Sequence, residues 1–172
     1  MNRIFDKFNQ LADSANVQNG TLRSKNWFMR LASNENQINS INKVTDKLKT
    51  PSRLKPGMMI TYTYTPKYAE KLSYYDTHPL VLITEINRTG WVGMNVHYMH
   101  PKQRAHMFYR HQKNGMPFMD ESLTKRYLSN HVLGPVKEIP KEQWEIAIQL
   151  PYESFRKVSK EKVWKMTKKV KK

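Results

Sequence analysis

Six histidines are the side chains of this 172-residue sequence that could most readily bind a metal ion or move a proton. His97 and His100 form a His-x-x-His pair, and His106 and His111 follow on a predicted helix. The first pair lies at a strand end, where its side chains diverge unless the chain turns. The second is one residue away from the i, i+4 spacing that places two ligands on one helical face. We therefore expect no metal site and no cofactor.

A nuclease is the enzymatic alternative, because a histidine can exchange a proton with the reacting groups during phosphodiester cleavage. His97 or His100 could act together with Glu85 and Arg104. The carboxylates, however, form no paired spacing, and the sequence has no glycine-rich phosphate loop, Walker motif or G-x-S-x-G motif. We expect a protein that is not an enzyme and has no catalytic residues, and we keep an intracellular nucleic-acid-binding or nuclease-type factor as the alternative function.

Positive charge is concentrated at the two ends of the chain, whose formal net charge is +16. Lys/Arg and Asp/Glu number 10 and 4 in residues 1–56, 11 and 9 in residues 57–155, and 9 and 1 in residues 156–172. Such a distribution predicts basic arms that bind a polyanion. DNA or RNA is the first expectation, and an acidic protein or an anionic membrane is the next. A solubilising tail is the alternative.

The predicted nucleic-acid contacts are basic side chains that bind phosphates without reading sequence. They lie in the C-terminal tail, around an aromatic pair at residues 27 and 28, and on a helix predicted after Pro101. They are Arg156, Lys157, Lys160, Lys162, Lys165, Lys168, Lys169, Arg23, Lys25, Arg30, Lys102, Arg104 and Arg110.

Aromatic residues near these cations are the predicted partner-binding residues. They are Trp27, Phe28, Tyr74, Tyr75 and Trp164. An aromatic ring between basic side chains can stack on an unpaired base. For Trp27 and Phe28 we favour insertion into a hydrophobic groove.

Three strand-like runs lie at the centre of the chain. Residues 57–65 and 91–99 alternate apolar with polar or small residues, and residues 79–86 are almost wholly apolar, as in a strand covered on both faces. The short polar turn before Gly90 predicts a hairpin between the last two runs. We expect a small SH3-like antiparallel β-barrel that bends at Gly57 and Gly93.

Helical patterns flank these runs. An amphipathic stripe over residues 2–15 must dock on the barrel or, as we favour, on a partner or a second copy. Ser24 is a possible N-cap, and Asp76 is expected to accept backbone N–H groups and fix a tyrosine-rich loop over residues 65–78. Further helices are predicted over residues 101–112, 120–129 and 140–150, and a closing strand over residues 131–139.

The predicted organisation is α+β, with short peripheral helices around the barrel. It comprises an N-terminal helical or extended arm (residues 1–53), the barrel domain (54–150) and a basic C-terminal tail (151–172). The sequence lacks cysteine, which excludes a disulfide framework and fits a reducing cytosol. No apolar run approaches the ~20 residues of a membrane span. We expect no membrane partner and no signal peptide.

The run YYDTHPLVLITEI followed by GWVGMNVHYMHPKQR resembles small proteins of T-even-type tailed bacteriophages. The resemblance extends to SKNWF upstream and to IPKEQWEIAIQLPYESF with KVW downstream, so it covers most of the chain. His78 and Met99 stand where family members tend to have Phe and Leu, which loosens the match at two strand ends. The resemblance implies a phage-encoded, virion-associated protein at the packaged DNA end or at the head–tail junction.

We therefore expect a non-enzymatic phage structural protein, made in the host cytoplasm and located in the virion. The barrel is expected to bind other phage structural proteins within an oligomer or a larger assembly. The basic arms are expected to contact DNA or neighbouring subunits. A protein that only joins subunits, with the tail on an acidic protein face, is the third possibility.

Overall fold

The computed structural model describes residues 3–33, 41–115 and 117–170, which form two compact units. The helical unit consists of Met1–Leu48, Pro101–Phe118 and Ile139–Tyr152, and the sheet unit of Lys49–His100, Met119–Glu138 and Glu153–Lys172. Each unit is discontinuous in sequence. This division differs from the three consecutive segments expected from the sequence, because the chain leaves and re-enters each unit.

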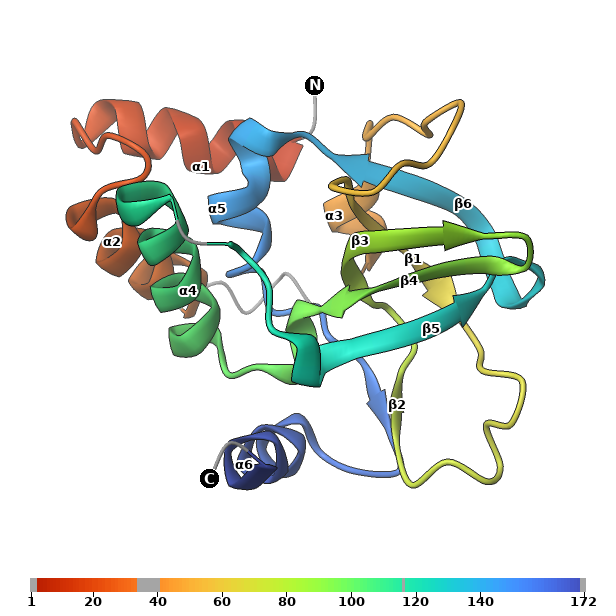
Figure 1. Ribbon diagram of the computed structural model, residues 1–172. Helices are drawn as coiled ribbons and strands as arrows, with labels where there is room; N and C mark the ends of the chain where they lie inside the picture. Colours follow the sequence, from red (N-terminus) through yellow and green to blue (C-terminus); the bar gives the residue numbers. More distant parts are fainter. Residues whose placement is uncertain (1–2, 34–40, 116, 171–172) are drawn as a thin grey trace. The chain divides into compact units, whose positions relative to one another are not determined.

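The helical unit is built around the buried stripe of its first helix. Phe5, Phe8 and Ala12 are buried, and the Phe8 ring stacks on Phe28 with 6.4 Å between centroids. The preference for a partner or a second copy as the dock of this stripe was therefore wrong, since its own unit covers it. The helices are α1 (Arg3–Ser14), α2 (Leu22–Ser33), α3 (Ile41–Thr45), α4 (Pro101–Asn114) and α5 (Trp144–Ala147), with the 3-10 turn η4 (Lys141–Gln143) before α5 (Figure 1).

Reciprocal hydrogen bonds define the start of α2. The Thr21 N–H donates to Ser24 Oγ, and the Ser24 N–H donates to Thr21 Oγ1, both at 3.0 Å. Because α2 begins at Leu22, Thr21 occupies the N-cap position, and the expectation of Ser24 as the N-cap was wrong: Ser24 is the third helical residue and completes a reciprocal capping pair with Thr21. Ser24 Oγ also donates to a carboxylate oxygen of Glu145 at 2.6 Å, and the Gly20 N–H donates to the other oxygen. Burial raises the pKa of Glu145, although these two donors oppose the shift.

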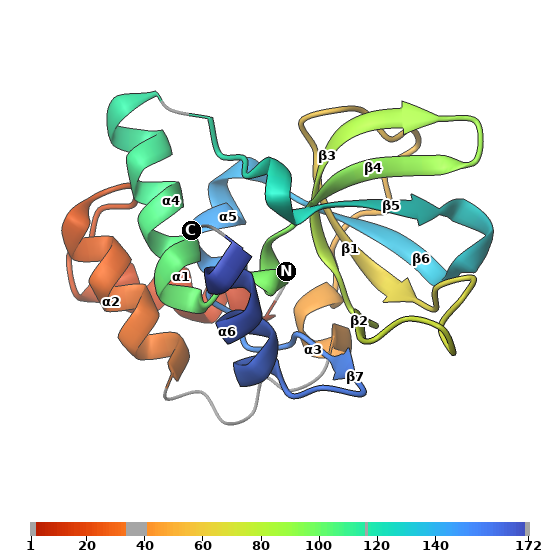
Figure 2. The same ribbon diagram turned by 60° about the horizontal axis from the view of Figure 1, so that its bottom comes forward.

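The sheet unit contains a five-stranded sheet in the order β5-β4-β3-β1-β6 and a small antiparallel sheet of β2 and β7 (Figure 2). The first two central runs form strands as predicted, and the third is a strand only as far as Asn95, because Val96–Tyr98 form a 3-10 turn. The elements are β1 (Met59–Tyr64), β2 (Tyr75–Asp76), β3 (Leu80–Asn87), β4 (Gly90–Asn95), η1 (Val96–Tyr98), η2 (Glu121–Leu123), β5 (Thr124–Leu128), η3 (Ser129–His131), β6 (Val132–Ile139), β7 (Phe155–Arg156) and α6 (Lys160–Val170).

Three expectations about this unit require correction. The sheet does not close into a barrel within the described residues, so the SH3-like barrel is not confirmed. The helix predicted over residues 120–129 was wrong, because residues 124–128 pair with β4 and place Tyr127 opposite Trp91. The tail is also not an extended arm, since α6 buries Val163 and Trp164 and the Trp164 indole N–H donates to the carbonyl of His97 at 2.9 Å. In the described part of the chain, no helix has the length and apolar character that a membrane span needs.

Aromatic residues dominate the core on one face of the sheet. Tyr62 makes edge-on contacts with Tyr64, Trp91 and Tyr127, with centroids 5.2–6.0 Å apart. The Trp91 indole N–H donates to the Tyr62 hydroxyl at 3.0 Å. Because each ring meets its neighbour edge to face, the cluster gains electrostatic as well as hydrophobic stabilisation. Ile60, Val81 and Ile83 complete this core cluster.

Gly93 allows β3 and β4 to approach closely at an irregular point in their pairing. A Cβ atom at Gly93 would lie 2.4 Å from Val81 Cγ1 and 2.6 Å from the Leu82 carbonyl oxygen. The register shifts between Ile83 and Glu85, next to the Ile83–Gly93 pair. The extra residue of this bulge lies on β3, so the bulge bends β3, and the bend expected at Gly93 of β4 stays a prediction.

We expect Gly93→Ala to lower the free energy of unfolding by about 1–3 kcal/mol, the typical cost of forcing atoms into a packed site. Urea unfolding followed by tryptophan fluorescence measures the loss. Glu85→Ala, at an exposed position beside the bulge, is the control and should change it little. Equal stability of the two variants would contradict the close approach.

Candidate nucleic-acid interface

Helices α2 and α4 pack against each other and together carry seven Lys or Arg residues and no Asp or Glu (Figure 2). We call their exposed cations the α2–α4 basic face. It consists of Arg23, Arg30, Lys102, Arg110 and Lys113, which are exposed, and Lys25, which is half-buried. The two helices contain no Asp or Glu, so their combined charge is strongly positive and favours an anionic partner.

Tyr109 lies between two of these cations. The Nζ atoms of Lys25 and Lys113 are 5.5 and 5.7 Å from the centroid of its ring. Both distances are within the range of a cation–π interaction, which orients a lysine without neutralising it. The contact therefore holds two positive charges close together on the basic face, where phosphate groups could replace their solvent counterions.

Two predicted phosphate contacts have structural roles in the helical unit. Arg104 is fully buried, and its guanidinium donates to the Ile148 carbonyl at 3.1 Å. It is not available to a phosphate in this conformation, contrary to the expectation. Arg23 is exposed, but it donates to the carbonyls of Ala15 and Asn16 just beyond α1. Charge there complements the negative end of the α1 dipole.

The predicted partner-binding pair at residues 27 and 28 is divided between the surface and the core. Phe28 is fully buried against Phe8, so it is a core residue of the helical unit. Trp27 is half-buried and meets the Phe28 ring edge-on at 5.0 Å. Of the two, only Trp27 offers a partly exposed surface.

The cations of the tail also have different environments. Lys157, at a positive φ of 71°, donates from Nζ to the carbonyls of Ala69, Glu70 and Leu72 at 2.7, 3.1 and 2.7 Å. Lys160 pairs with Glu153 at 3.3 Å. Arg156, Lys162 and Lys165 are exposed, and the side chains of Lys168 and Lys169 lie outside the described residues. Of the tail cations described, those at 156, 162 and 165 remain the simplest candidates for phosphate contact.

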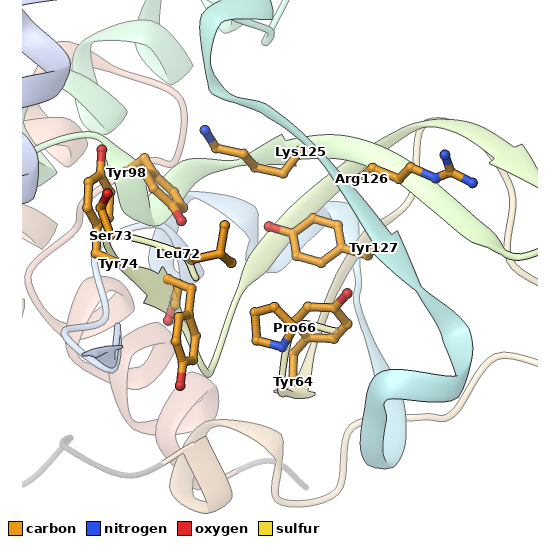
Figure 3. Close-up of a pocket in the computed structure, with 11 residues that line it drawn as sticks. Tyr64, Pro66, Leu72, Ser73, Tyr74, Tyr98, Lys125, Arg126 and Tyr127 are labelled. Atoms are coloured by element: carbon orange, nitrogen blue, oxygen red, sulfur yellow. The ribbon is translucent and has the colours of Figure 1, made fainter. Parts of the chain in front are cut away.

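A second feature of the sheet unit is a pocket of about 380 Å³ beside β5 (Figure 3). We call it the tyrosine pocket. Lys125 extends toward the Tyr98 ring, with Nζ 4.7 Å from its centroid, whereas Arg126 points away and donates to Thr89. The residues that line the tyrosine pocket are Tyr64, Pro66, Leu72, Ser73, Tyr74, Tyr75, Asp76, Tyr98, Lys125, Arg126 and Tyr127.

Asp76 connects the segments that form this pocket. Its Oδ1 accepts the N–H groups of His78 and Ser154, at 3.0 and 3.1 Å. Its Oδ2 accepts the Asn95 amide at 3.2 Å and His97 Nδ1 at 2.8 Å. Burial would raise the pKa of Asp76, but His97 and the backbone donors together hold it below its ordinary value. We call these contacts the Asp76 network, and they confirm the predicted structural role of Asp76.

The network also fixes the pocket tyrosines. The Tyr98 hydroxyl is bonded to the backbone of Asp76, and the Tyr127 hydroxyl to the Asn95 side chain. Burial raises the pKa of both hydroxyls, so both stay protonated at neutral pH. Burial also lowers the pKa of Lys125, the cation beside them.

The pocket wall on β5 was missed by sequence reasoning. Residues 120–129 were expected to be helical, so Lys125 and Tyr127 were not placed beside Tyr74 and Tyr98. The alternation of Lys125 and Tyr127 with Arg126 between them was the available signal, because residues two apart share a face of a strand. Tyr74 and Tyr75, in contrast, were selected from the sequence and do line the pocket.

The histidines of the nuclease alternative do not form an accessible site. His97 is fully buried in the Asp76 network, and the His100 ring packs edge-on against Trp164 at 5.0 Å. Glu85 is exposed on β3. Within residues 3–33, 41–115 and 117–170, no group of three His, Asp or Glu side chains could hold a metal ion.

We expect Asp76→Asn to lower the free energy of unfolding by about 3 kcal/mol at pH 7, because an amide NH2 group replaces one carboxylate oxygen and leaves two buried donors without an acceptor. An acid whose pKa is lowered by folding stabilises the protein above its unfolded-state pKa, here about 4, and that stability is lost as the pH falls through the lowered value. Urea unfolding at pH 7 and pH 3 should therefore show a smaller difference between the two proteins at pH 3. A constant difference would contradict the charge on Asp76.

Replacing Lys157 should loosen the loop that it contacts. In Lys157→Gln we expect faster hydrogen exchange at the amides of residues 69–72, because three carbonyls lose their cationic donor. Lys162→Gln removes the same charge from an exposed position of the sheet unit and serves as the control. Unchanged exchange in the first variant would show that the contacts do not order the loop.

Comparison with known proteins gives one family. A family model described as phage T4 terminal DNA protecting protein matches residues 9–114. The matched region contains α2 and α4 and the strands β1 to β4. No curated protein and no solved structure matches the chain. Since the match spans more than half of the sequence, this chain belongs to the phage T4 terminal DNA protecting protein family.

Proposed function

We propose that this protein binds the ends of phage DNA and shields them from nucleases, without being an enzyme itself. The observation that carries the proposal is the α2–α4 basic face, with its cations on two packed helices that lack carboxylates. The family description supports the choice of DNA ends as the anionic partner. Shielding requires only occupancy of the end, so no catalytic group is needed.

The chemistry of the basic face fits contact with phosphates. Exposed Lys and Arg side chains on a helix bind phosphate oxygens and release condensed counterions, which gives affinity on any sequence. The helical unit contains 12 Lys/Arg and 6 Asp/Glu, and the sheet unit 18 and 8. Both units are therefore attracted to DNA. The exposed cations of the tail, Arg156, Lys162 and Lys165, form a second candidate contact.

We further propose that the protein is part of the virion, where packaged DNA ends are located. Other phage structural proteins are its expected partners, in an oligomer or a larger assembly. Trp27, half-buried beside Phe28, is the predicted aromatic that could contact such a partner. Mass spectrometry of purified particles tests this proposal, and absence from the particle would favour an intracellular role instead.

Removal of charge from α4 should weaken end protection. We expect the triple variant Lys102→Gln, Arg110→Gln and Lys113→Gln to protect a linear duplex from an exonuclease far less well than the unmodified protein. If each side chain contacts one phosphate, the slope of log affinity against log salt should fall by about three. Digestion of end-labelled duplex and a salt titration measure the two effects.

A matched triple variant controls for net charge. Lys7, Lys43 and Lys141 are exposed lysines of the helical unit that lie outside α2 and α4. Their replacement by Gln removes the same charge and should leave protection nearly unchanged. Equal loss in both triple variants would show that total charge, not the basic face, determines binding. Equal binding of linear and closed circular duplex would exclude a DNA-end function.

A further inference from the structure

The α2–α4 basic face does not explain how a DNA end is distinguished from the rest of a duplex. Phosphates are present along the whole molecule, so cations on a helix bind an internal segment as readily as a terminus. What distinguishes an end is that a terminal base can leave the stack and expose both its faces. A pocket that accepts one base would therefore supply the missing discrimination.

The tyrosine pocket has the size and lining for such a base. Its volume of about 380 Å³ lies within the usual range for small-molecule sites. Tyr74 is half-buried at its wall and lies 6.1 Å from Tyr98 between ring centroids. Tyr98 itself is braced by an edge-on contact with Phe155 at 5.1 Å. Tyr98 is buried and supports Tyr74, whose partly exposed ring is a preorganised surface for stacking on a base.

The charge of the lining selects an anionic ligand. Lys125 is half-buried, with its ammonium over the Tyr98 ring. Asp76 is the one carboxylate in the lining, and its two oxygens already accept four hydrogen bonds. The carboxylate is thus occupied within the protein, and Lys125 is the charge that faces an incoming ligand. A ligand that combines an aromatic ring with a nearby negative charge fits this arrangement, and a nucleotide has both.

We propose that the tyrosine pocket binds an unpaired nucleotide at the end of a DNA strand, with its base against Tyr74 and its phosphate beside Lys125. This inference rests on the proposed DNA-end function and adds a site to it. A paired base cannot enter, because its partner and its stacked neighbours occupy the space around it. The loop that carries Tyr74 is fastened by Lys157, so the pocket exists before the nucleotide arrives.

Fluorescence anisotropy on labelled hairpin duplexes with one open end tests the site. The open end is blunt, or carries two unpaired nucleotides on the 3′ or the 5′ strand, or carries the same extensions without their bases. We expect at least one base-containing extension to bind about tenfold more tightly than the blunt end and than its abasic counterpart, as one stacked base typically gives. Equal affinity for base-containing and abasic extensions would overturn the inference.

Point variants identify the pocket as the source of the difference. Tyr74→Ala and Lys125→Gln should each reduce binding of the favoured extension to the blunt-end level and leave blunt-end binding unchanged. Tyr68→Ala on the same loop and Lys137→Gln, at another half-buried lysine of the sheet unit, lie outside the lining and should keep the tenfold preference. Retention of the preference in both pocket variants would also overturn the inference.

A duplex without ends separates a failure of this inference from a failure of the proposed function. A dumbbell duplex, with both ends closed by loops, supplies the reference for binding without an end. If the protein binds blunt ends more tightly than the dumbbell, and an unpaired base has no effect, the DNA-end function is supported and the role of the pocket is excluded. Dumbbell and open duplexes of equal affinity would remove both.

Discussion

A single buried carboxylate holds together segments that are far apart in the sequence of the sheet unit. Asp76 accepts hydrogen bonds from His78, Asn95, His97 and Ser154, so the loop after β1, the end of β4 and the chain beyond residue 153 meet at one group. An ionised carboxylate is costly to bury unless its lone pairs are filled, and here each oxygen has two donors. The positions of Tyr98 and Tyr127 both follow from this arrangement.

In the proposed function, the two units contribute differently to the binding of a DNA end. The helical unit offers cations on two helices that contain no Asp or Glu, and the proposed affinity for DNA of any sequence depends on them. The sheet unit offers a tyrosine-lined pocket in which Lys125 lies over the Tyr98 ring and Arg126 points away, which fits the single base and phosphate proposed for it. The family match ends at residue 114 and so includes the basic face and Tyr74 and Tyr98, but not Lys125.

Local sequence patterns predicted much of the fold. The alternation in residues 57–65 and the apolar run at 79–86 became β1 and β3, and the stripe in residues 2–15 became α1. The pattern could not show which surface the stripe would meet, since any apolar partner satisfies it. Residues 120–129 were misassigned because pairing with β4 outweighs a weak helical preference.

The candidate site was predicted less well than the fold. The basic residues were selected by charge alone. In the structure Arg104 is buried and Lys157 donates to loop carbonyls, so neither is a simple phosphate contact. The sequence alone shows neither the burial nor the carbonyl contacts. Tyr74 and Tyr75 were selected because tyrosine-rich loops often cover binding surfaces, and both line the pocket. The pocket wall on β5 could not be predicted without the pairing of β5 with β4, which joins residues as far apart in sequence as Gly90 and Leu128.

The lysine that follows β7 has a consequence for how this protein can be shortened. Residues 156 and 157 supply a strand partner for Tyr75 and a donor for three loop carbonyls, so this part of the chain is a strut for the tyrosine-rich loop. A truncation at residue 155 would subtract cations and at the same time release that loop. A stop after residue 159 would keep the contacts of residues 156 and 157 with the loop, but it would remove the Trp164 indole that donates to the His97 carbonyl. Of the two truncations, it is the better one for testing the role of the last lysines.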